Sequence, residues 1–408
     1  MMRRWVGAAV MAGCLGLVQA ARAQVPPVGP GAACRPPEPI PVGAAQAPAP
    51  DPEPNLVPGP LTPQLAPEGP PDSLSLPADG TGAFPSKAVE LDSGTYFHIG
   101  ALMWKRQDPG SGVIAVQDPQ NLDTGTPPPA GAPVLQRFNN IDPGYNAGIT
   151  ATLGTLWNGN ECLEATIFYT FQGRQTSSIA SEGRIDSFFT NPPLGFEGDN
   201  GMFLQDDRLS TTLSSTLWGA EVNYRVADPA LSEAELILGV RYVDLFEKLG
   251  STFDDDGIQF PMTNGLPDPA RVATYNVQTE NRFVGPQLGF EWGRRVGKFF
   301  TLGVTAKGAL GADFAQLNRS LTRGDGYVGF DGQRDTIQFS AVSEGGAFID
   351  FHVLDRARIR LAYNALWFSN MVNVVDQYDF NLQNTNQFDK RNGSVLFHGP
   401  QLEFQFLF

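Results

Sequence analysis

The chain has 408 residues, of which 17% are charged and 45 are glycine, with only three cysteines and three histidines. Beyond the N-terminus no stretch approaches the roughly 18 consecutive apolar residues that a membrane helix needs, so a polytopic helical membrane protein is excluded. The net charge of -15 argues against a nucleic-acid partner, because phosphate binding needs a basic face. So few cysteines and histidines also argue against a disulfide framework or a multi-ligand metal site, and we predict no cofactor.

Residues 1–23 have the pattern of a secretory signal peptide. Two arginines near the start precede an apolar stretch over residues 5–18, and Ala21-Arg22-Ala23 forms an A-x-A cleavage site. A lipoprotein signal ending at Cys14 is the alternative, since small residues precede that cysteine, but it would leave a short apolar segment.

Residues 24–92 form a proline-rich segment that holds more than half of the 34 prolines in the chain. With so few aromatic residues, the segment cannot bury enough surface to offset its ordering entropy. We therefore predict a disordered periplasmic spacer in extended polyproline II conformation. Its functional interpretation is a tether to the cell wall, and a disordered tail with no partner is the alternative.

From Tyr96 onward, apolar and polar residues alternate with a period of two. Residues 145–154, 162–171 and 300–307 are clear examples. Such alternation is typical of strands with one face in an apolar medium and the other in a polar one. We predict ten strands, near residues 95–106, 143–157, 161–173, 208–226, 234–247, 276–292, 298–312, 336–353, 357–370 and 394–408.

The connections between these strands alternate strictly between short and long. The long ones are expected at 107–142, 174–207, 248–275, 313–335 and 371–393, and the turns between them are short. Outer-membrane barrels have an even strand number, short periplasmic turns and long external loops. We therefore predict an all-β fold over residues 93–408: a single antiparallel transmembrane β-barrel of about ten strands, with twelve as the alternative count, in the bacterial outer membrane.

Aromatic residues near the predicted strand ends indicate two girdles at the membrane interfaces, although such a stripe can also belong to the core of a β protein. The periplasmic girdle would contain Trp157, Tyr224, Trp292 and Phe300, and the outer girdle Trp104, Phe171, Tyr242 and Trp367.

Apolar residues occupy every second position over residues 402–408, and most of the positions between them are polar. These apolar residues are Leu402, Phe404, Phe406 and Phe408. We interpret them as an assembly signal that the barrel assembly machinery would engage by strand addition.

Nearly every charged residue in mid-strand falls on the polar face, because a charge facing lipid would cost about 2–4 kcal/mol. We expect these residues to line a narrow lumen and to pair, since unpaired buried charge is costly. The candidate lumen-lining residues are Glu164, Glu221, Arg225, Glu235, Arg241, Gln287, Glu291, Lys307, Glu344, Arg360 and Glu403.

A catalytic carboxylate pair among these charges is the alternative to a structural network. No nucleophile elbow or paired-histidine motif supports it, so we predict no catalytic residue and no enzyme. The acidic run at 254–256 offers oxygen ligands for calcium but lacks the rest of an EF-hand loop, so we predict no metal site there.

Three stretches resemble a bacterial family of putative outer-membrane beta-barrel porins: residues 241–249, residues 281–289 and residues 363–379. Where that family usually has Arg-Pro before an Asp-Gln pair, this chain has Asn373-Val374. The resemblance implies a barrel in contact with outer-membrane lipid, but no substrate. We therefore predict a porin-like barrel with a narrow mixed-charge lumen and long external loops. The alternative is a non-conducting structural or adhesin-type barrel that binds through those loops.

Overall fold

The computed structural model describes residues 93–117, 131–157, 160–196, 202–227, 234–255, 268–384 and 392–408. The predicted signal peptide and spacer, residues 1–92, lie outside the described residues. Within these ranges the secondary structure is almost entirely β-strand, and the helices are short 3-10 turns such as Phe138–Asn140. None of the described helices is long and apolar enough to cross a membrane.

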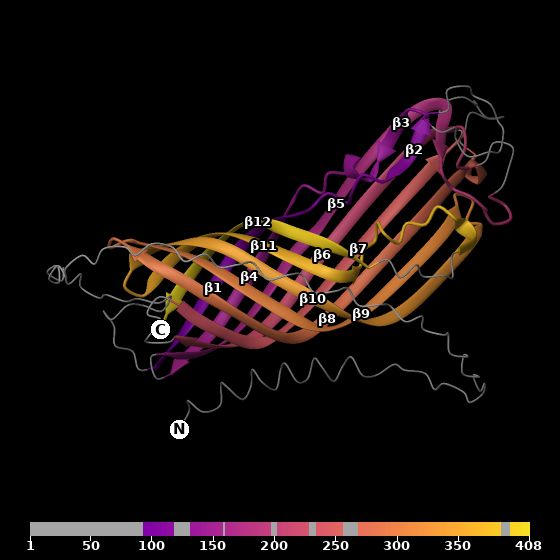
Figure 1. Ribbon diagram of the computed structural model, residues 1–408. Helices are drawn as coiled ribbons and strands as arrows, with labels where there is room; N and C mark the ends of the chain where they lie inside the picture. Colours follow the sequence, from indigo (N-terminus) through magenta and orange to yellow (C-terminus); the bar gives the residue numbers. More distant parts are fainter. Residues whose placement is uncertain are drawn as a thin grey trace, which may run out of the picture. The chain divides into compact units, whose positions relative to one another are not determined.

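Ten long strands, each antiparallel to its neighbours, form a closed ring (Figure 1). They are β1 (Ser93–Arg106), β4 (Tyr145–Trp157), β5 (Glu161–Ser187), β6 (Asp206–Ala227), β7 (Ala234–Asp254), β8 (Val272–Val296), β9 (Phe300–Arg323), β10 (Val328–Leu354), β11 (Ala357–Val372) and β12 (Asn392–Leu407). The ring closes because β1 pairs with β12 on one side and with β4 on the other. This arrangement confirms the predicted all-β antiparallel barrel.

Two further strands lie outside the ring. The short strand β2 (Val113–Gln117) pairs with the end of β5, and β3 (Val134–Arg137) pairs with β2. They bring the sheet to twelve strands in total, of which ten make the barrel wall.

The two ends of the barrel differ. At one end, hereafter the terminal end, β1 begins, Phe408 pairs with Thr95, and short connections such as 297–299 and 355–356 join the strands. The opposite end, hereafter the loop end, carries the longer connections.

Six neighbouring strands, β5 to β10, are much longer than the alternation predicted. They have 21 to 27 residues, whereas β1, β4, β11 and β12 have 13 to 16. Figure 1 shows the long strands continuing past the others at the loop end, and we call this part the extension. The predicted loop at 313–335 is therefore wrong. Strands β9 and β10 run through it as a hairpin closed by residues 324–327, with Gly326 at a φ of +91°.

The polarity of a strand's inner and outer faces changes along its length, and this explains the difference. Near the terminal end of β6, Glu221 and Asn223 are buried inside the ring while Val222 is 41% exposed outside. In the extension the same strand buries Leu209 inside and exposes Arg208 outside. A strand that leaves lipid for water needs a polar outer face. The same inverted pattern over residues 313–323 of β9, where Leu317 and Leu321 are buried inside, made that part of the extension look like a polar loop in the sequence.

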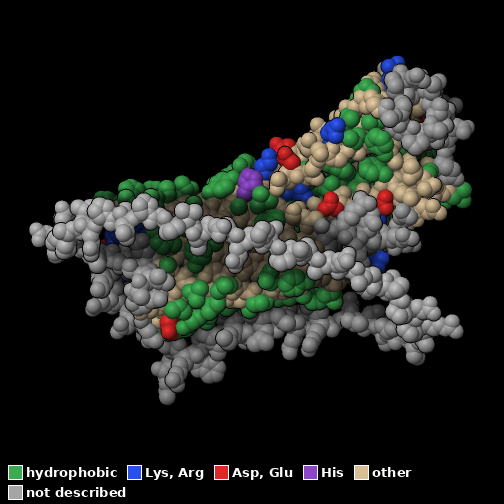
Figure 2. Space-filling view, in the orientation of Figure 1, with side chains coloured by type: hydrophobic (Ala, Val, Ile, Leu, Met, Phe, Trp, Pro, Cys, Tyr) green, Lys and Arg blue, Asp and Glu red, His purple; other side chains and the backbone are tan. Residues whose placement is uncertain are grey.

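The outer surface of the ring is apolar. Many large hydrophobic side chains on it are 40% or more exposed, and all four residues of the predicted assembly signal are at least as exposed: Leu402, Phe404, Phe406 and Phe408. Figure 2 shows hydrophobic side chains gathered over the ring, with charged side chains near the start of the extension. This surface is suited to lipid contact.

The predicted outer girdle is wrong at one position. Trp104 is only 4% exposed because its position on β1 points the indole into the ring, whereas Phe171 and Trp367 do lie on the outer surface.

Two apolar clusters fill the inside of the barrel toward the loop end. The first, hereafter the apolar layer, takes residues from eight of the ten ring strands: Leu102, Trp104, Leu217, Val243, Leu245, Phe283, Ala309, Val342, Leu366, Phe368, Met371, Val395 and Phe397. The second fills the extension and is rich in aromatic contacts, such as those of Phe189 with Phe203 and Tyr275. Together they leave the polar part of the interior at the terminal end.

Candidate functional site

A cavity of about 180 Å³ occupies the ring between the terminal end and the apolar layer. Its lining begins at the β10–β11 turn, around Asp355, and ends at Leu102 and Trp104. Of the predicted lumen-lining residues, ten line this cavity: Glu164, Glu221, Arg225, Glu235, Arg241, Glu291, Lys307, Glu344, Arg360 and Glu403. Gln287 lies behind the lining, 3% exposed and bonded to Glu221. The alternation along the strands thus puts all of these side chains inside the ring.

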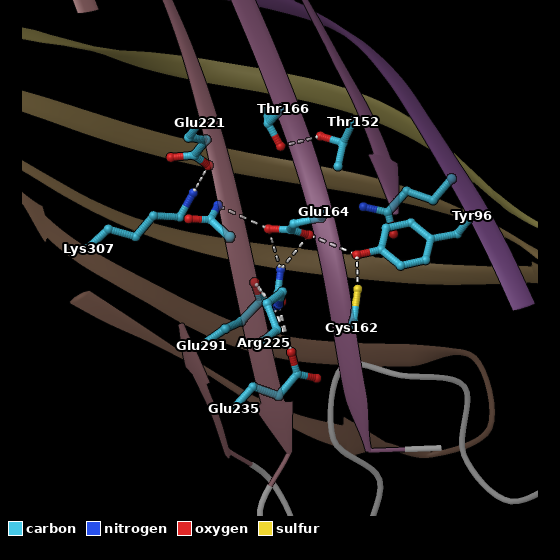
Figure 3. Close-up of polar contacts among 12 residues, drawn as sticks. Tyr96, Thr152, Cys162, Glu164, Thr166, Glu221, Arg225, Glu235, Glu291 and Lys307 are labelled. Carbon is cyan, nitrogen blue, oxygen red and sulfur yellow. Dashed lines mark hydrogen bonds and ion pairs between the residues drawn. The ribbon is translucent and has the colours of Figure 1, made fainter. Parts of the chain in front are cut away.

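Arg225 is the centre of the first group of charges (Figure 3). Its guanidinium lies 2.7 Å from Glu235, 2.9 Å from Glu291 and 3.3 Å from Glu164. Glu164 also accepts a hydrogen bond of 2.8 Å from the hydroxyl of Tyr96, a residue of β1. One arginine thus holds carboxylates from three different strands.

Glu221 is the centre of the second group. It pairs with Arg241 and with Lys307, each at 2.6 Å, and accepts a hydrogen bond from the amide of Gln287 at 3.0 Å. Arg241 makes a further ion pair with Glu344 on β10. The Glu221–Arg241 pair joins neighbouring strands along the wall. The Lys307–Glu221 and Arg241–Glu344 pairs connect strands that are not neighbours in the ring, so these two pairs cross the lumen.

Arg360 joins the first group to β10 and β11. It contacts Glu291 at 2.9 Å and Asp350 at 2.7 Å, and its guanidinium stacks over the ring of Phe348 at 3.7 Å. Because Glu291 contacts both Arg225 and Arg360, these pairs form one connected set. We call the two groups and this link the ion-pair network. A buried charge is costly unless it is paired and hydrogen-bonded, so the network explains how so many charges fit inside a narrow ring.

Glycines make room for the long side chains of the interior. A Cβ on Gly154 would lie 2.1 Å from the ring of Tyr96, and a Cβ on Gly303 would lie 2.2 Å from the ring of Phe348. These two aromatic rings therefore lie flat over glycines of the neighbouring strand. Only a residue without a side chain permits so close an approach.

Glu403 differs from the other carboxylates of the ring strands that line the cavity. It is 8% exposed, and of the carboxylates on the described ring strands that line the cavity it alone has no cation within ion-pair distance. Asp313, farther along β9, is likewise held by an amide, that of Gln338, and not by a cation. Its two oxygens instead accept hydrogen bonds from the side-chain amides of Gln401 and Gln405. Its cross-strand neighbour Arg360 directs its guanidinium to Asp350 and Glu291.

A buried ion pair lies beyond the apolar layer, where the extension begins. Arg106 on β1 pairs with Glu247 on β7 and donates to Asn373 at 3.2 Å. Both charged side chains are at most 2% exposed. The two strands stand far apart in the ring, so this pair also crosses the lumen.

Sequence reasoning missed Arg106, Glu247 and the uncharged members of the site other than Gln287. Glu247 stands in the same alternation as Arg241, which could have placed it inside, but Arg106 is the last residue of its strand. Tyr96, Gln401 and Gln405 carry no charge, and an inward polar residue is too common a feature to single out.

Among the described residues, no group of three His, Cys, Asp or Glu side chains is arranged to hold a metal ion. The acidic run at 254–256 is only partly described, because residue 256 lies outside the described ranges.

A family model described as Putative beta barrel porin-7 (BBP7) matches residues 96–405. Among solved structures, the chain is similar to the outer membrane protease OmpT from Escherichia coli, with 12% identity and a TM-score of 0.35 over 77% of this chain and 97% of that chain. It is also similar to the toluene transporter TodX of P. putida, with 10% identity and a TM-score of 0.29 over 79% of this chain and 91% of that one. Neither structural likeness is close enough to carry information on function. A comparison with curated proteins finds no match.

Proposed function

The chain belongs to the Putative beta barrel porin-7 family of the bacterial outer membrane, and from that premise we propose that it is a closed barrel rather than an open diffusion pore. The observation that carries the proposal is that side chains cross the ring at two successive levels: the ion-pair network, beside the cavity, and the apolar layer beyond it. Eight-stranded barrels have interiors that side chains fill, whereas sixteen to eighteen strands leave an aqueous channel. Ten strands are near the filled limit.

Each level opposes the passage of ions for its own reason. An ion that crosses the network must displace pairs such as Lys307–Glu221, and breaking a buried pair costs about 3–5 kcal/mol. An ion that crosses the apolar layer must lose water among side chains such as Phe283 and Phe368, and hydrophobic constrictions stop conduction by dewetting. The two costs act in series along the same path.

In a closed barrel, the extension is the part that would act as a binding surface. Short turns face the periplasm in barrels of this kind, so we place the terminal end in the periplasm and the extension outside the cell. The extension has its own apolar core and a polar outer face, and it is a rigid surface rather than a set of loops. This supports a structural or adhesin-type role in which the barrel holds the extension at the cell surface.

The proposal has three further parts. The barrel assembly machinery would recognise the last strand, with Leu402, Phe404 and Phe406 on its outer face, during insertion. The proline-rich segment before β1 would reach from the terminal end toward the cell wall. We assign no catalytic role, because the buried carboxylates are held by arginine, lysine and amide groups rather than set beside a nucleophile.

Two measurements test the proposal. Liposomes that contain the refolded full-length protein should swell in small neutral solutes no faster than protein-free liposomes. In a Cys34→Ser background, a membrane-impermeant maleimide should label Asp335→Cys, in the extension, on intact cells, and should label Lys298→Cys, at the terminal end, only after the outer membrane is opened. Fast swelling would contradict the closed barrel, and labelling of Lys298→Cys on intact cells would invert the orientation.

A further inference from the structure

The charges inside the ring do not balance. On the strands around the cavity, seven inward carboxylates face five inward cations, and these carboxylates are Glu164, Glu221, Glu235, Glu291, Glu344, Asp350 and Glu403. The cations are Arg225, Arg241, Lys307, Arg358 and Arg360. A buried carboxylate is stabilised by a nearby positive charge, so an interior with an excess of acids favours a cationic ligand. The excess is greatest at Glu403, which has no ion-pair partner among the described residues.

Glu403 is held in a fixed position by a chain of hydrogen bonds. The side-chain amide of Asn364 donates to the side-chain oxygen Oε1 of Gln401 at 2.7 Å, so the side-chain nitrogen Nε2 of Gln401 is left to donate to Glu403. On the other side Arg358 donates to the side-chain oxygen Oε1 of Gln405, and the side-chain nitrogen Nε2 of Gln405 donates to Glu403 at 3.0 Å. Both glutamines are therefore oriented as donors to the carboxylate.

This arrangement leaves acceptor capacity on Glu403. An ionised carboxylate offers about four lone-pair sites, and the two glutamine amides use only two of them. A Cβ on Gly100, the neighbour on β1, would lie 2.8 Å from the Cγ of Glu403, so only glycine lets the side chain lie there. The carboxylate lines the cavity and is ready to accept further N–H donors.

Glu403 itself lies between Gly100 and Arg360, and the wall becomes apolar two residues along β12, at Gln401. Gln401 is paired with Leu102 on one side and with Ala362 on the other, and both of these residues line the cavity. Trp104 and Phe168 complete this wall, at the boundary with the apolar layer. The cavity thus sets one carboxylate that has no ion pair of its own close to a hydrocarbon surface.

We propose that the cavity binds a small organic ammonium compound, with the N–H groups on the Glu403 carboxylate and the carbon part against Leu102 and Ala362. An inorganic divalent cation fits less well, because it needs six or more oxygen ligands and the described residues hold no cluster of acidic side chains at such spacing. An anion is excluded by the excess of carboxylates. The ligand would enter from the terminal end, where the cavity lining reaches the β10–β11 turn.

The test uses the refolded full-length protein in detergent and n-butylammonium chloride as the probe, followed by isothermal titration calorimetry. We expect saturable binding that n-butanol does not reproduce and that equimolar sodium chloride does not displace. Glu403→Gln should weaken binding at least tenfold, because the probe loses its counter-charge while the side-chain shape is kept. Ala362→Leu, which keeps the carboxylate and fills the space beside it, should also weaken binding.

Asp331→Asn is the matched control, since it removes one negative charge from an exposed position on β10 and should leave binding unchanged. Heat-modifiable mobility on a denaturing gel verifies that every variant is folded. Absence of saturable binding to the wild type, equal binding to Glu403→Gln, or displacement by sodium would each overturn the inference. A barrel that conducts would contradict the proposed function but not this site, so the two can fail separately.

Discussion

Replacing Arg225 by methionine tests how the ion-pair network holds the ring together. The substitution removes contacts with three carboxylates, but two of these keep other partners. Glu291 keeps Arg360 at 2.9 Å, and Glu164 keeps the hydroxyl of Tyr96 at 2.8 Å. Glu235 loses its one ion-pair partner among the described residues and is 1% exposed. The cost should therefore be close to that of one uncompensated buried charge, about 3–5 kcal/mol.

The free energy of unfolding should be measured by urea titration in lipid vesicles, with tryptophan fluorescence as the signal. Adding Glu235→Gln to Arg225→Met should recover more than half of the loss, because it removes the orphaned charge. Arg282→Met is the control, since Arg282 is 49% exposed in its pair with Glu280 and such pairs contribute about 0–1 kcal/mol. A loss below about 1 kcal/mol for Arg225→Met, or a double variant no more stable than the single one, would refute the reasoning.

Three further predictions concern other parts of the chain. Burial, together with the nearby carboxylates of Asp255 and Asp186, raises the pKa of Asp206 well above its usual range, so the folded extension binds a proton more tightly than the unfolded chain. Stability should therefore fall as pH rises from the unfolded pKa of about 4 toward the folded value, and Asp206→Asn should abolish that slope in urea titrations; a slope of the opposite sign would count against it. Gly154→Val should prevent a folded, heat-modifiable barrel from forming, because its side chain would collide with the ring of Tyr96; normal mobility on a gel would show that the ring can move aside. Phe408→Asp should leave precursor in the periplasm, as measured by membrane fractionation, and full outer-membrane yield would place the assembly signal elsewhere.

The barrel could be predicted from the sequence because lipid imposes a strict period of two. All ten predicted strands are present, since each has an apolar outer face next to lipid and a polar inner face. The extension could not be predicted in the same way. Outside lipid the outer face of β9 becomes polar and its inner face becomes apolar at Leu317 and Leu321, so the local pattern no longer distinguishes a strand from a polar loop.

The charged residues of the site could be placed by the same alternation, but their partners could not. The Lys307–Glu221 and Arg241–Glu344 pairs depend on which strands face each other across the ring, and sequence spacing does not contain that information. The amides around Glu403 were missed for a related reason. Gln401 and Gln405 act only through their orientation, which Asn364 and Arg358 impose from β11.

The most direct test of the closed barrel is the single-channel conductance of the refolded full-length protein in a planar lipid bilayer, with insertion verified in parallel by heat-modifiable mobility. Ion pairs cross the lumen beside the cavity and the apolar layer lies beyond them, so inserted protein should give no steady conductance steps above those of the protein-free bilayer. Large, steady and weakly selective steps from the unmodified protein would contradict this account, because they would require a continuous aqueous path through both the ion-pair network and the apolar layer.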